Sequence, residues 1–211
     1  GDRPGRAQAH HVGTRSGHVG HARGVATRRP VGGDQRAVDH VEATDGEGRF
    51  VTLRADAYVL AMGSLSPLLA APLGVRLPIY PAKGYSVTMP VRDASMAHQV
   101  SLTDDEYKLV FSRLTTPATA TSPGGDRLRI AGTAEMAGYD TGLDSHTAQV
   151  RCAALVKRYE ELFPGVADTR EPNFWTGLRP STPTNIPYIG RSPVHNLWVN
   201  AGHGTLGWTH G

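Results

Sequence analysis

Residues 55–64 read ADAYVLAMGS, and this stretch decides the fold class. Its run of apolar side chains without alternation is typical of a strand buried on both faces of a parallel sheet. Gly63-Ser64 ends the run as a turn, and Ser66-Pro67 is able to begin a helix, because Pro is favoured at the first helical position. A strand, a glycine turn and a helix in this order predict an α/β fold.

Shorter β-type runs lie on both sides of this stretch. Val38–Glu42 and Phe50–Leu53 flank the turn residues 44–48, which predicts a β-hairpin. The run from Ile79 to Pro90 contains Pro81, which cannot donate a backbone hydrogen bond. We therefore expect a bend or an edge strand there.

The middle of the chain alternates between strands and loops. Tyr107–Leu114 alternates apolar and polar side chains, residues 115–125 are rich in Thr, Pro, Ala and Gly, and Asp126–Thr133 is again β-type. Hairpins are the simplest connection between such strands, so the sequence predicts an antiparallel sheet in this region.

Residues 144–163 form the clearest predicted helix. Asp144 or Ser145 supplies an N-cap, and Pro164-Gly165 ends the helix. The lone cysteine, Cys152, lies on the apolar stripe, and we interpret it as a small core residue and not as a nucleophile. The stripe at helical spacing consists of Ala148, Cys152, Leu155, Tyr159 and Leu162.

Composition excludes several classes of protein. Hydrophobic residues make up 39% of the 211 residues, and no run approaches the ~18 apolar residues that a membrane-spanning helix needs. A single cysteine excludes an internal disulfide framework and a cysteine-cluster metal site, and no other metal-ligand set stands out. We therefore predict an ordinary globular chain without a metal and without a transmembrane segment.

The net charge of +3 is unevenly distributed. Residues 1–36 hold seven Arg, four His, eight Gly and two Asp, with no Leu, Ile, Met or aromatic side chain, so we predict a disordered segment. Three interpretations compete: an Arg/Gly arm that binds nucleic acid, a histidine metal site, and a segment without selected function such as a shifted reading frame. We favour the third and expect no nucleic-acid partner.

The C-terminal part carries a glycine pattern that suits a cofactor. Gly202, Gly204 and Gly207 match G-x-G-x-x-G directly after the predicted strand 196–201. Glycine there lets the backbone approach a phosphate or a flat ring. No acidic residue follows about 20 positions on to hold a ribose, so a tight structural turn is an equal interpretation.

Single residues with chemical potential each have two interpretations. Arg179, between Leu178 and Pro180, suits a bidentate carboxylate clamp, or it stacks on an aromatic ring or pairs with an internal Asp. His203 is an acid/base candidate or a backbone hydrogen-bonding residue of the turn. Lys83 beside Gly84 faces either a cofactor or solvent.

These segments together resemble the FAD-dependent D-amino acid dehydrogenase small subunit, in the D-amino acid oxidase and glycine oxidase superfamily. The resemblance spans roughly residues 37–211, whereas residues 1–36 match nothing in that family, and Thr184-Asn185 stands where the family usually has Asp-Gly. The motifs that carry it are residues 55–69, 80–86, 105–108, 111–114, 132–140, 174–183 and 200–208.

The resemblance implies a mixed α/β (α+β) fold, a C-terminal fragment cut at both ends. It would comprise part of a Rossmann-like FAD-binding domain (37–78), an antiparallel-sheet substrate domain (79–180, with helix 144–163), and a return to the FAD-binding domain (181–211). We expect the fragment to be inactive by itself, because the family's N-terminal glycine-rich turn for the ADP half of FAD is missing.

The resemblance also implies a function, the oxidative deamination of D-amino acids to 2-oxo acids and ammonia with FAD as cofactor. Arg179 and Tyr107 would be the catalytic residues, and Tyr85, Tyr107 and Trp175 would exclude water. Electrons would pass to an acceptor such as a membrane quinone chain, on the cytoplasmic side of a bacterial inner membrane. The implied cofactor-binding residues are Gly63, Lys83, Gly84, Gly202, His203, Gly204, Thr205 and Leu206.

Two other functions compete with this one. The first is a glycine or sarcosine oxidase-like flavoenzyme, with the same fold, another substrate and oxygen as electron acceptor. The second, of a different class, is a non-catalytic fragment whose basic residues 1–36 bind nucleic acid.

Overall fold

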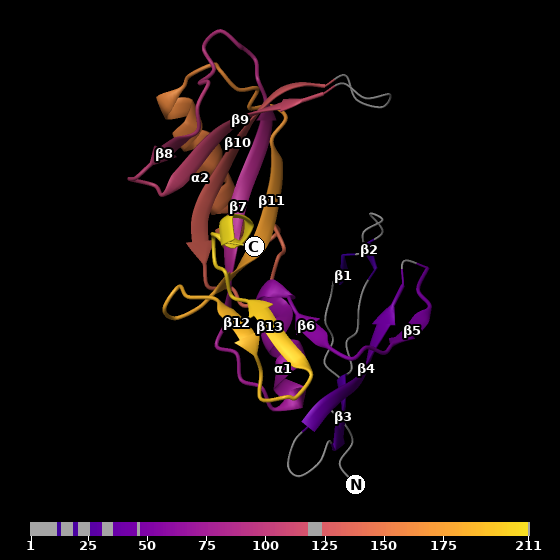
Figure 1. Cartoon of the computed structure of the whole chain (residues 1–211). Coiled ribbons are helices and arrows are strands. Elements are labelled where there is room, and N and C mark those ends of the chain that lie inside the picture. The colour runs from indigo at the N-terminus through magenta and orange to yellow at the C-terminus, as the bar shows by residue number, and fades with distance from the viewer. Residues whose placement is uncertain are drawn as a thin grey trace. The chain divides into compact units, whose positions relative to one another are not determined.

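The chain folds into two compact units, the first formed by Gly1–Pro81 with Arg179–Gly211 and the second by Ala82–Leu178 (Figure 1). The computed structural model describes residues 36–45, 47–117 and 124–210, together with the backbone of three short N-terminal strands. The division falls at residue 81 where the sequence predicts 78, and at 178 where it predicts 180. The short strands are β1 (Val12–Gly13), β2 (Val19–Gly20) and β3 (Ala26–Pro30).

A three-stranded sheet organises the first unit. Its order is β12 (Tyr188–Arg191), β13 (Leu197–Ala201) and β6 (Tyr58–Leu60), and β13 runs parallel to β6. This confirms the parallel strand predicted from the ADAYVLAMGS stretch. The segments that follow β6 are η1 (Gly63–Leu65), α1 (Ser66–Ala70) and η2 (Ala71–Leu73).

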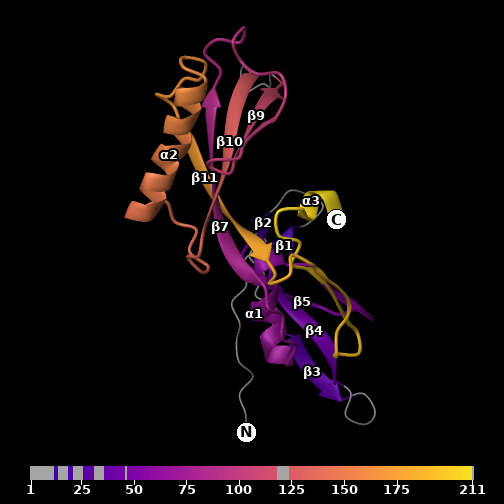
Figure 2. The same cartoon turned by 90° about the vertical axis from the view of Figure 1, so that its left-hand side faces the viewer.

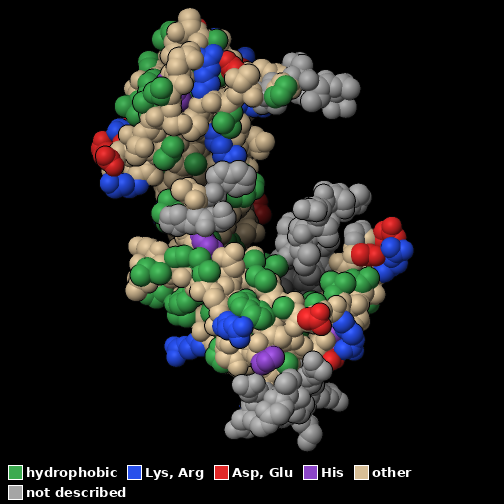
Figure 3. All heavy atoms as spheres, in the orientation of Figure 1, with side chains coloured by type: hydrophobic (Ala, Val, Ile, Leu, Met, Phe, Trp, Pro, Cys, Tyr) green, Lys and Arg blue, Asp and Glu red, His purple; other side chains and the backbone are tan. Residues whose placement is uncertain are grey.

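Within the described residues, this sheet buries only one of its faces. Leu60 and Leu197 pack with Ala70 and Leu73 on the covered face. On the other face Val59 and Ile189 are each 65% exposed, and apolar side chains gather over these strands in the lower part of Figure 3. The expectation of a strand buried on both faces is therefore wrong for the described part of the chain, because α1 and η2 cover only one face.

The predicted hairpin is present and extends further than expected. β4 (Arg36–Thr44) pairs antiparallel with β5 (Phe50–Leu53) around the turn, and β3 pairs antiparallel with the other edge of β4. The expectation of disorder is therefore wrong at β3. An edge strand is held by backbone hydrogen bonds and needs no large apolar side chains. Most of residues 1–35 lie outside the described residues.

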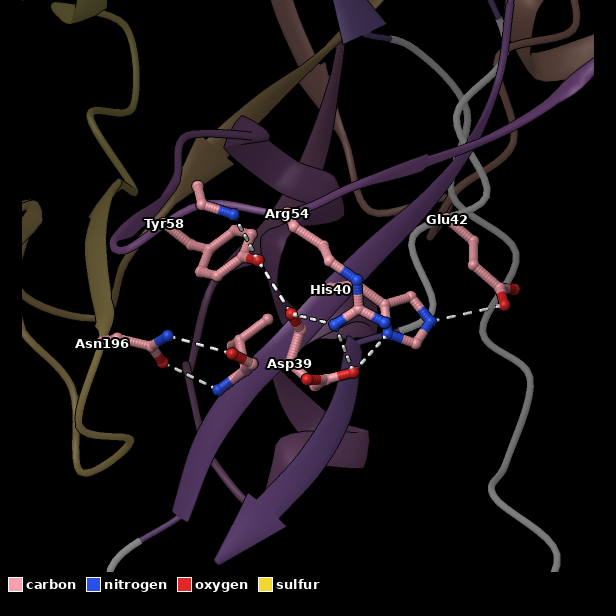
Figure 4. Close-up of polar contacts among 8 residues, drawn as sticks. Asp39, His40, Glu42, Arg54, Tyr58 and Asn196 are labelled. Atoms are coloured by element: carbon pink, nitrogen blue, oxygen red, sulfur yellow. Dashed lines mark hydrogen bonds and ion pairs between the residues drawn. The ribbon is translucent and has the colours of Figure 1, made fainter. Parts of the chain in front are cut away.

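A buried asparagine joins this hairpin to the parallel sheet. The Asn196 side chain accepts from Val38 N at 2.7 Å and donates to Val38 O at 2.9 Å (Figure 4). Beside it, the Tyr58 hydroxyl donates to Asp39 O at 3.2 Å. The Asp39 carboxylate also accepts from His40 and Arg54, which hold its pKa below the ordinary value. Hydrogen bonds from the Asn196 side-chain amide thus join the two sheets in place of a continuous ladder of backbone hydrogen bonds.

The second unit is a five-stranded sheet with one long helix. α2 (His146–Leu162) lies along one face of the sheet (Figure 2), and the core between them includes Tyr85, Phe111, Leu128 and Tyr159. β10 runs antiparallel to both of its neighbours, as predicted. The strand order is β11 (Asn173–Ser181), β7 (Tyr80–Pro90), β10 (Gly125–Glu135), β9 (Leu109–Thr116) and β8 (Leu102–Asp104).

The strand β7 corrects one prediction. Pro81 predicts a bend or an edge, yet β7 is continuous over its 11 residues and lies between β11 and β10. Its pairing with β10 begins only at Lys83, opposite Glu135. Pro81 therefore precedes this ladder, where a missing N–H costs nothing.

The helix follows its prediction closely. The Ser145 hydroxyl accepts from Ala148 N at 3.2 Å as the N-cap, and the helix ends before Pro164-Gly165. Cys152 is buried in the core, and burial raises the pKa of its thiol, as expected for a packing residue. No helix in the described part of the chain is long and apolar enough to cross a bilayer.

Replacing Asn196 with Ala is expected to destabilise the first unit. Val38 N–H and C=O are buried and would each lose their side-chain partner, and an unsatisfied buried group costs about 1–3 kcal/mol. We expect the free energy of unfolding to fall by about 2–4 kcal/mol. Hydrogen exchange of first-unit amides measures this unit by itself. The matched control, Asn200→Ala on an exposed position of β13, should change it by less than about 0.5 kcal/mol. Equal exchange rates in both variants would contradict the role of Asn196.

Candidate functional site

Two glycine turns lie side by side in the first unit. β6 and β13 are parallel neighbours, and Leu60 lies opposite Val199. Gly63 and Gly202 each come three residues after this pair, so the two turns begin at the same level of the sheet. Both glycines have left-handed backbones, with φ of 53° and 84°. The carboxyl ends of neighbouring parallel strands are where open α/β sheets bind their ligands.

Position 202 requires glycine, both because its φ is positive and because neighbouring side chains leave no room for a Cβ. An added Cβ would lie 2.7 Å from the Thr182 methyl group and 3.5 Å from the Ile79 side chain. Thr182 is itself buried, and its hydroxyl donates to Ile186 O at 3.0 Å, so it has little freedom to move. The Gly202 backbone therefore packs directly against Thr182 and Ile79, which leaves no room for a larger residue.

The end of β11 reaches both glycine turns. Gly204 N donates to Pro180 O at 2.9 Å, and a Cβ on Gly63 would lie 3.9 Å from Pro180 Cγ. Arg179 immediately precedes this proline and is half-buried. Burial lowers the pKa of its guanidinium from an ordinary value of 12.5, which still leaves it charged at neutral pH. A charged, half-buried arginine thus directly precedes the residue that contacts both turns.

The Gly202–Gly207 turn also holds an unsatisfied ring nitrogen. His203 Nε2 is buried and has no hydrogen-bond partner among the described residues. Leu206 N donates to His203 O at 3.1 Å, and Thr205 and Leu206 are exposed ahead of α3 (Gly207–His210). Most buried polar atoms in proteins have a hydrogen-bond partner, so this ring nitrogen is available to a ligand or a water molecule.

The structure therefore brings together part of the predicted site. Arg179 and most of the cofactor-binding set lie around the two turns of the first unit, namely Gly63, Gly202, His203, Gly204, Thr205 and Leu206. Lys83, Gly84 and Tyr107 belong to the second unit. Pro180 and Thr182 also contact these turns but were not predicted as site residues, because their only signal in the sequence is their place in a proline-rich stretch.

Lys83, predicted to face either a cofactor or solvent, faces the protein interior. Its side chain is fully buried, and Nζ donates to Asp140 Oδ2 at 3.0 Å and to Gly142 O at 2.6 Å. Burial alone would lower its pKa, but the hydrogen bond to Asp140 and the nearby Tyr85 ring outweigh it and raise the pKa above its ordinary value. Lys83 thus ties the 136–145 loop to β7.

The aromatic residues expected to exclude water differ in their surroundings. Tyr85 lies inside the core of the second unit, where its hydroxyl contacts Glu135. Tyr107 is 44% exposed in the β8–β9 turn, and the Arg158 guanidinium carbon lies 4.5 Å from its ring centre. Trp175 is 58% exposed on β11. A catalytic role for Tyr107 stays a prediction.

Left-handed glycine turns at the ends of parallel strands, one of them with a buried histidine nitrogen that has no partner among the described residues, are typical of a ligand-binding site in an α/β fold. Sequence comparison identifies the family. Residues 19–211 match the sequence profile of the family described as FAD dependent oxidoreductase (DAO), and the chain belongs to that family.

The curated relatives carry one activity in their names. The chain is 57% identical over 163 residues to a D-amino acid dehydrogenase of Dechloromonas aromatica, a match covering 77% of this chain and 36% of the relative. It is 54% identical over 158 residues to a D-amino acid dehydrogenase of Paramagnetospirillum magneticum, covering 75% and 34%. The chain thus spans about a third of the length of these relatives.

Solved structures share the fold. Glycine oxidase from Geobacillus kaustophilus is 26% identical, with a TM-score of 0.55 over 79% of this chain and 40% of that chain. Iminodiacetate oxidase from Chelativorans is 18% identical, with a TM-score of 0.61 over 88% and 45%. The mixed α/β fold predicted from the sequence is confirmed.

The family match also corrects the interpretation of the basic segment. It begins at residue 19, so residues 19–36 belong to the family sequence, and β3 is one of the strands in that stretch. A shifted reading frame up to residue 36 is therefore wrong. Residues 1–18 lie before the match.

The residues of the two turns fit FAD, the cofactor of this family. Gly202 and Gly204 leave no side chain over the backbone, and His203 Nε2 offers a buried ring nitrogen for a hydrogen bond. Gly63 would present backbone from the neighbouring strand. Exposed backbone and a ring nitrogen of this kind are able to contact a flat ring or a phosphate.

Replacing Lys83 with Met is expected to destabilise the second unit. The variant loses two hydrogen bonds but leaves Asp140 largely in water, because that side chain is 56% exposed. We expect the free energy of unfolding of this unit to fall by about 1–3 kcal/mol, measured by hydrogen exchange of β7 and β10 amides. Lys157→Met, at an exposed position of α2, is the control and should change it by less than about 0.5 kcal/mol. Unchanged exchange in Lys83→Met would contradict a structural role and return Lys83 to the candidate cofactor contacts.

Proposed function

We propose that this chain forms the C-terminal part of a D-amino acid dehydrogenase, which oxidises D-amino acids to 2-oxo acids and ammonia. The single observation that carries the proposal is Arg179, a half-buried arginine that directly precedes Pro180, the residue of β11 that contacts both glycine turns. The names of the curated relatives, at up to 57% identity, support the substrate class.

Arg179 has the chemistry to hold an amino acid by its carboxylate. A guanidinium binds a carboxylate through two parallel hydrogen bonds, which fixes the orientation of the substrate as well as its position. Burial strengthens this interaction because less water competes for the charge. With the carboxylate fixed, the α-C–H bond has a defined direction, and correct orientation is a large part of catalysis.

The glycine turns would determine where the cofactor lies. When bound, FAD would supply the redox chemistry as the acceptor of the α-hydrogen as a hydride. The amino group would lose a proton to solvent as the imino acid forms, and water would hydrolyse the imino acid to the 2-oxo acid and ammonia. Gly202 and Gly204 would let the backbone approach the cofactor closely, and His203 Nε2, which has no partner among the described residues, would gain a hydrogen bond.

The electron acceptor is a further part of the proposal. The curated relatives are named dehydrogenases, which supports an acceptor other than oxygen, and we propose a membrane quinone chain reached from the cytoplasmic side. A glycine oxidase-like activity is the second candidate, because the 26% identical neighbour is a glycine oxidase. Assays with D-alanine and glycine, with and without oxygen, distinguish the two.

Arg179 is tested in a chimaeric enzyme. Residues 37–211 replace the matching segment of the Dechloromonas aromatica D-amino acid dehydrogenase, which supplies the remainder of the fold. Arg179→Lys should lower kcat/KM for D-alanine by roughly one to two orders of magnitude, because the two-pronged geometry is lost. Arg179→Ala should cost more, while the flavin content stays unchanged.

Two controls make the result specific. Arg76→Lys, at an exposed position of the first unit, should leave kcat/KM unchanged. An amide analogue of the substrate should lose activity with the unmodified chimaera and change little with Arg179→Ala. If both enzymes lose activity equally on the amide, or if flavin dissociates from the variant, Arg179 is structural and the proposal for this residue fails.

A further inference from the structure

The second unit has one sheet face that α2 does not cover. Side chains alternate along β10, so Leu128 and Ile130 enter the core while Arg127 and Arg129 lie on the other face, here called the open face. Between Arg127 and Ala131, the described residues of β7, β10 and β9 on this face include no carboxylate. Its other residues in the sheet register are Ser86, Thr88 and Pro90 on β7, and Val110, Ser112 and Leu114 on β9.

The arginines on the two faces differ in their partners. On the covered face Arg113 Nε donates to Asp126 Oδ2 at 3.0 Å. Arg129, on the open face, has no ion pair among the described residues and only one hydrogen bond, from Nη2 to Ser86 Oγ at 3.2 Å. Arg127 has no ion pair among them either. Within the described part of the chain, Arg113 has a counter-ion, whereas Arg127 and Arg129 have none.

A tryptophan holds Arg129 in place. The Arg129 guanidinium carbon lies 5.6 Å from the centre of the Trp175 ring on β11. An added Cβ on Gly177 would lie 2.2 Å from that ring, so the indole lies across Gly177 and only glycine leaves room for it. Ser86, which accepts the hydrogen bond, is 2% exposed. Trp175, Ser86 and the space left by Gly177 therefore determine the position of one guanidinium on the open face.

Such a guanidinium suits a carboxylate. Arg has five N–H donors, of which Arg129 uses one on Ser86, and a stacked guanidinium is already oriented for bidentate binding. Arg127 lies two residues further along the same strand face, about 7 Å away. Val110 and Leu114, 43% and 42% exposed, provide apolar surface nearby. Two positive groups at this spacing match the two ends of a short dicarboxylate.

We propose that the open face of the second unit is a binding site for a small dicarboxylate. One carboxylate binds Arg129 in the bidentate manner, and the other pairs with Arg127. This proposal does not depend on the carboxylate clamp proposed for Arg179. A free dicarboxylic acid and an acidic D-amino acid share the required chemistry, so both are probes.

The test is an NMR titration of the whole chain with glutarate at low ionic strength. The reporter is the indole N–H signal of Trp175, assigned by its loss in Trp175→Phe. We expect a saturable shift with a Kd of about 1 mM, and binding of acetate that is about tenfold weaker. D-Glutamate in place of glutarate distinguishes the two sources. Binding of glutarate alone, or of both, supports the site, and binding of neither overturns it.

Variants separate the site from general charge. Arg129→Lys keeps the charge but loses the planar fork, and it should weaken glutarate binding at least tenfold. Gly177→Ala should do the same, because the added methyl group displaces the Trp175 ring. Lys157→Met, an exposed position on α2, is the matched charge control and should keep the affinity. Equal weakening in Lys157→Met, or full affinity in Arg129→Lys, overturns the proposal. Amide dispersion in the same spectra verifies that each variant is folded.

Discussion

The parallel pairing of β6 with β13 is the constraint on which the candidate site depends. It aligns Leu60 with Val199, and this alignment places Gly63 and Gly202 next to each other beyond the strand ends. The end of β11 then reaches both turns through Pro180. A shift of one residue in this register would turn the buried side chains of β13 to the other face and separate the two glycines. The site is therefore a consequence of strand register as much as of the residues within it.

Local pattern was sufficient for much of the fold. The helix at 146–162, the hairpin of β4 and β5, and the strand before Gly63 were predictable, because each depends on neighbours in sequence. Long-range partners decided the rest. Pro81 indicated an edge strand, but nothing local shows that the ladder with β10 begins two residues later. The segment at β3 lacks large apolar side chains, and only its pairing with β4 makes it a strand.

The same distinction applies to functional residues. Arg179 and the Gly202–Gly207 turn could be proposed as candidates from the sequence, because the proline and the glycines beside them form recognisable patterns. Lys83 was interpreted from its neighbour Gly84, whereas its surroundings are set by Asp140 and Gly142, which are distant in sequence. Arg129 carried no signal at all. Its significance lies in the absence of a carboxylate on one sheet face, and only the register of three strands reveals that absence.

The division of the chain into two units also has a consequence for folding during synthesis. The first unit is discontinuous: the chain leaves it along β7 and returns along β11, which are neighbours in one sheet. On the ribosome β6 must therefore wait for its parallel partner until the whole second unit has been translated. The second unit is one continuous segment, so we expect it to fold once residue 178 has emerged. Its folding places the ends of β7 and β11, and with them the two segments of the first unit, close together. Its early folding shortens the loop that the β6–β13 pairing has to close, and so lowers the entropic cost of that closure.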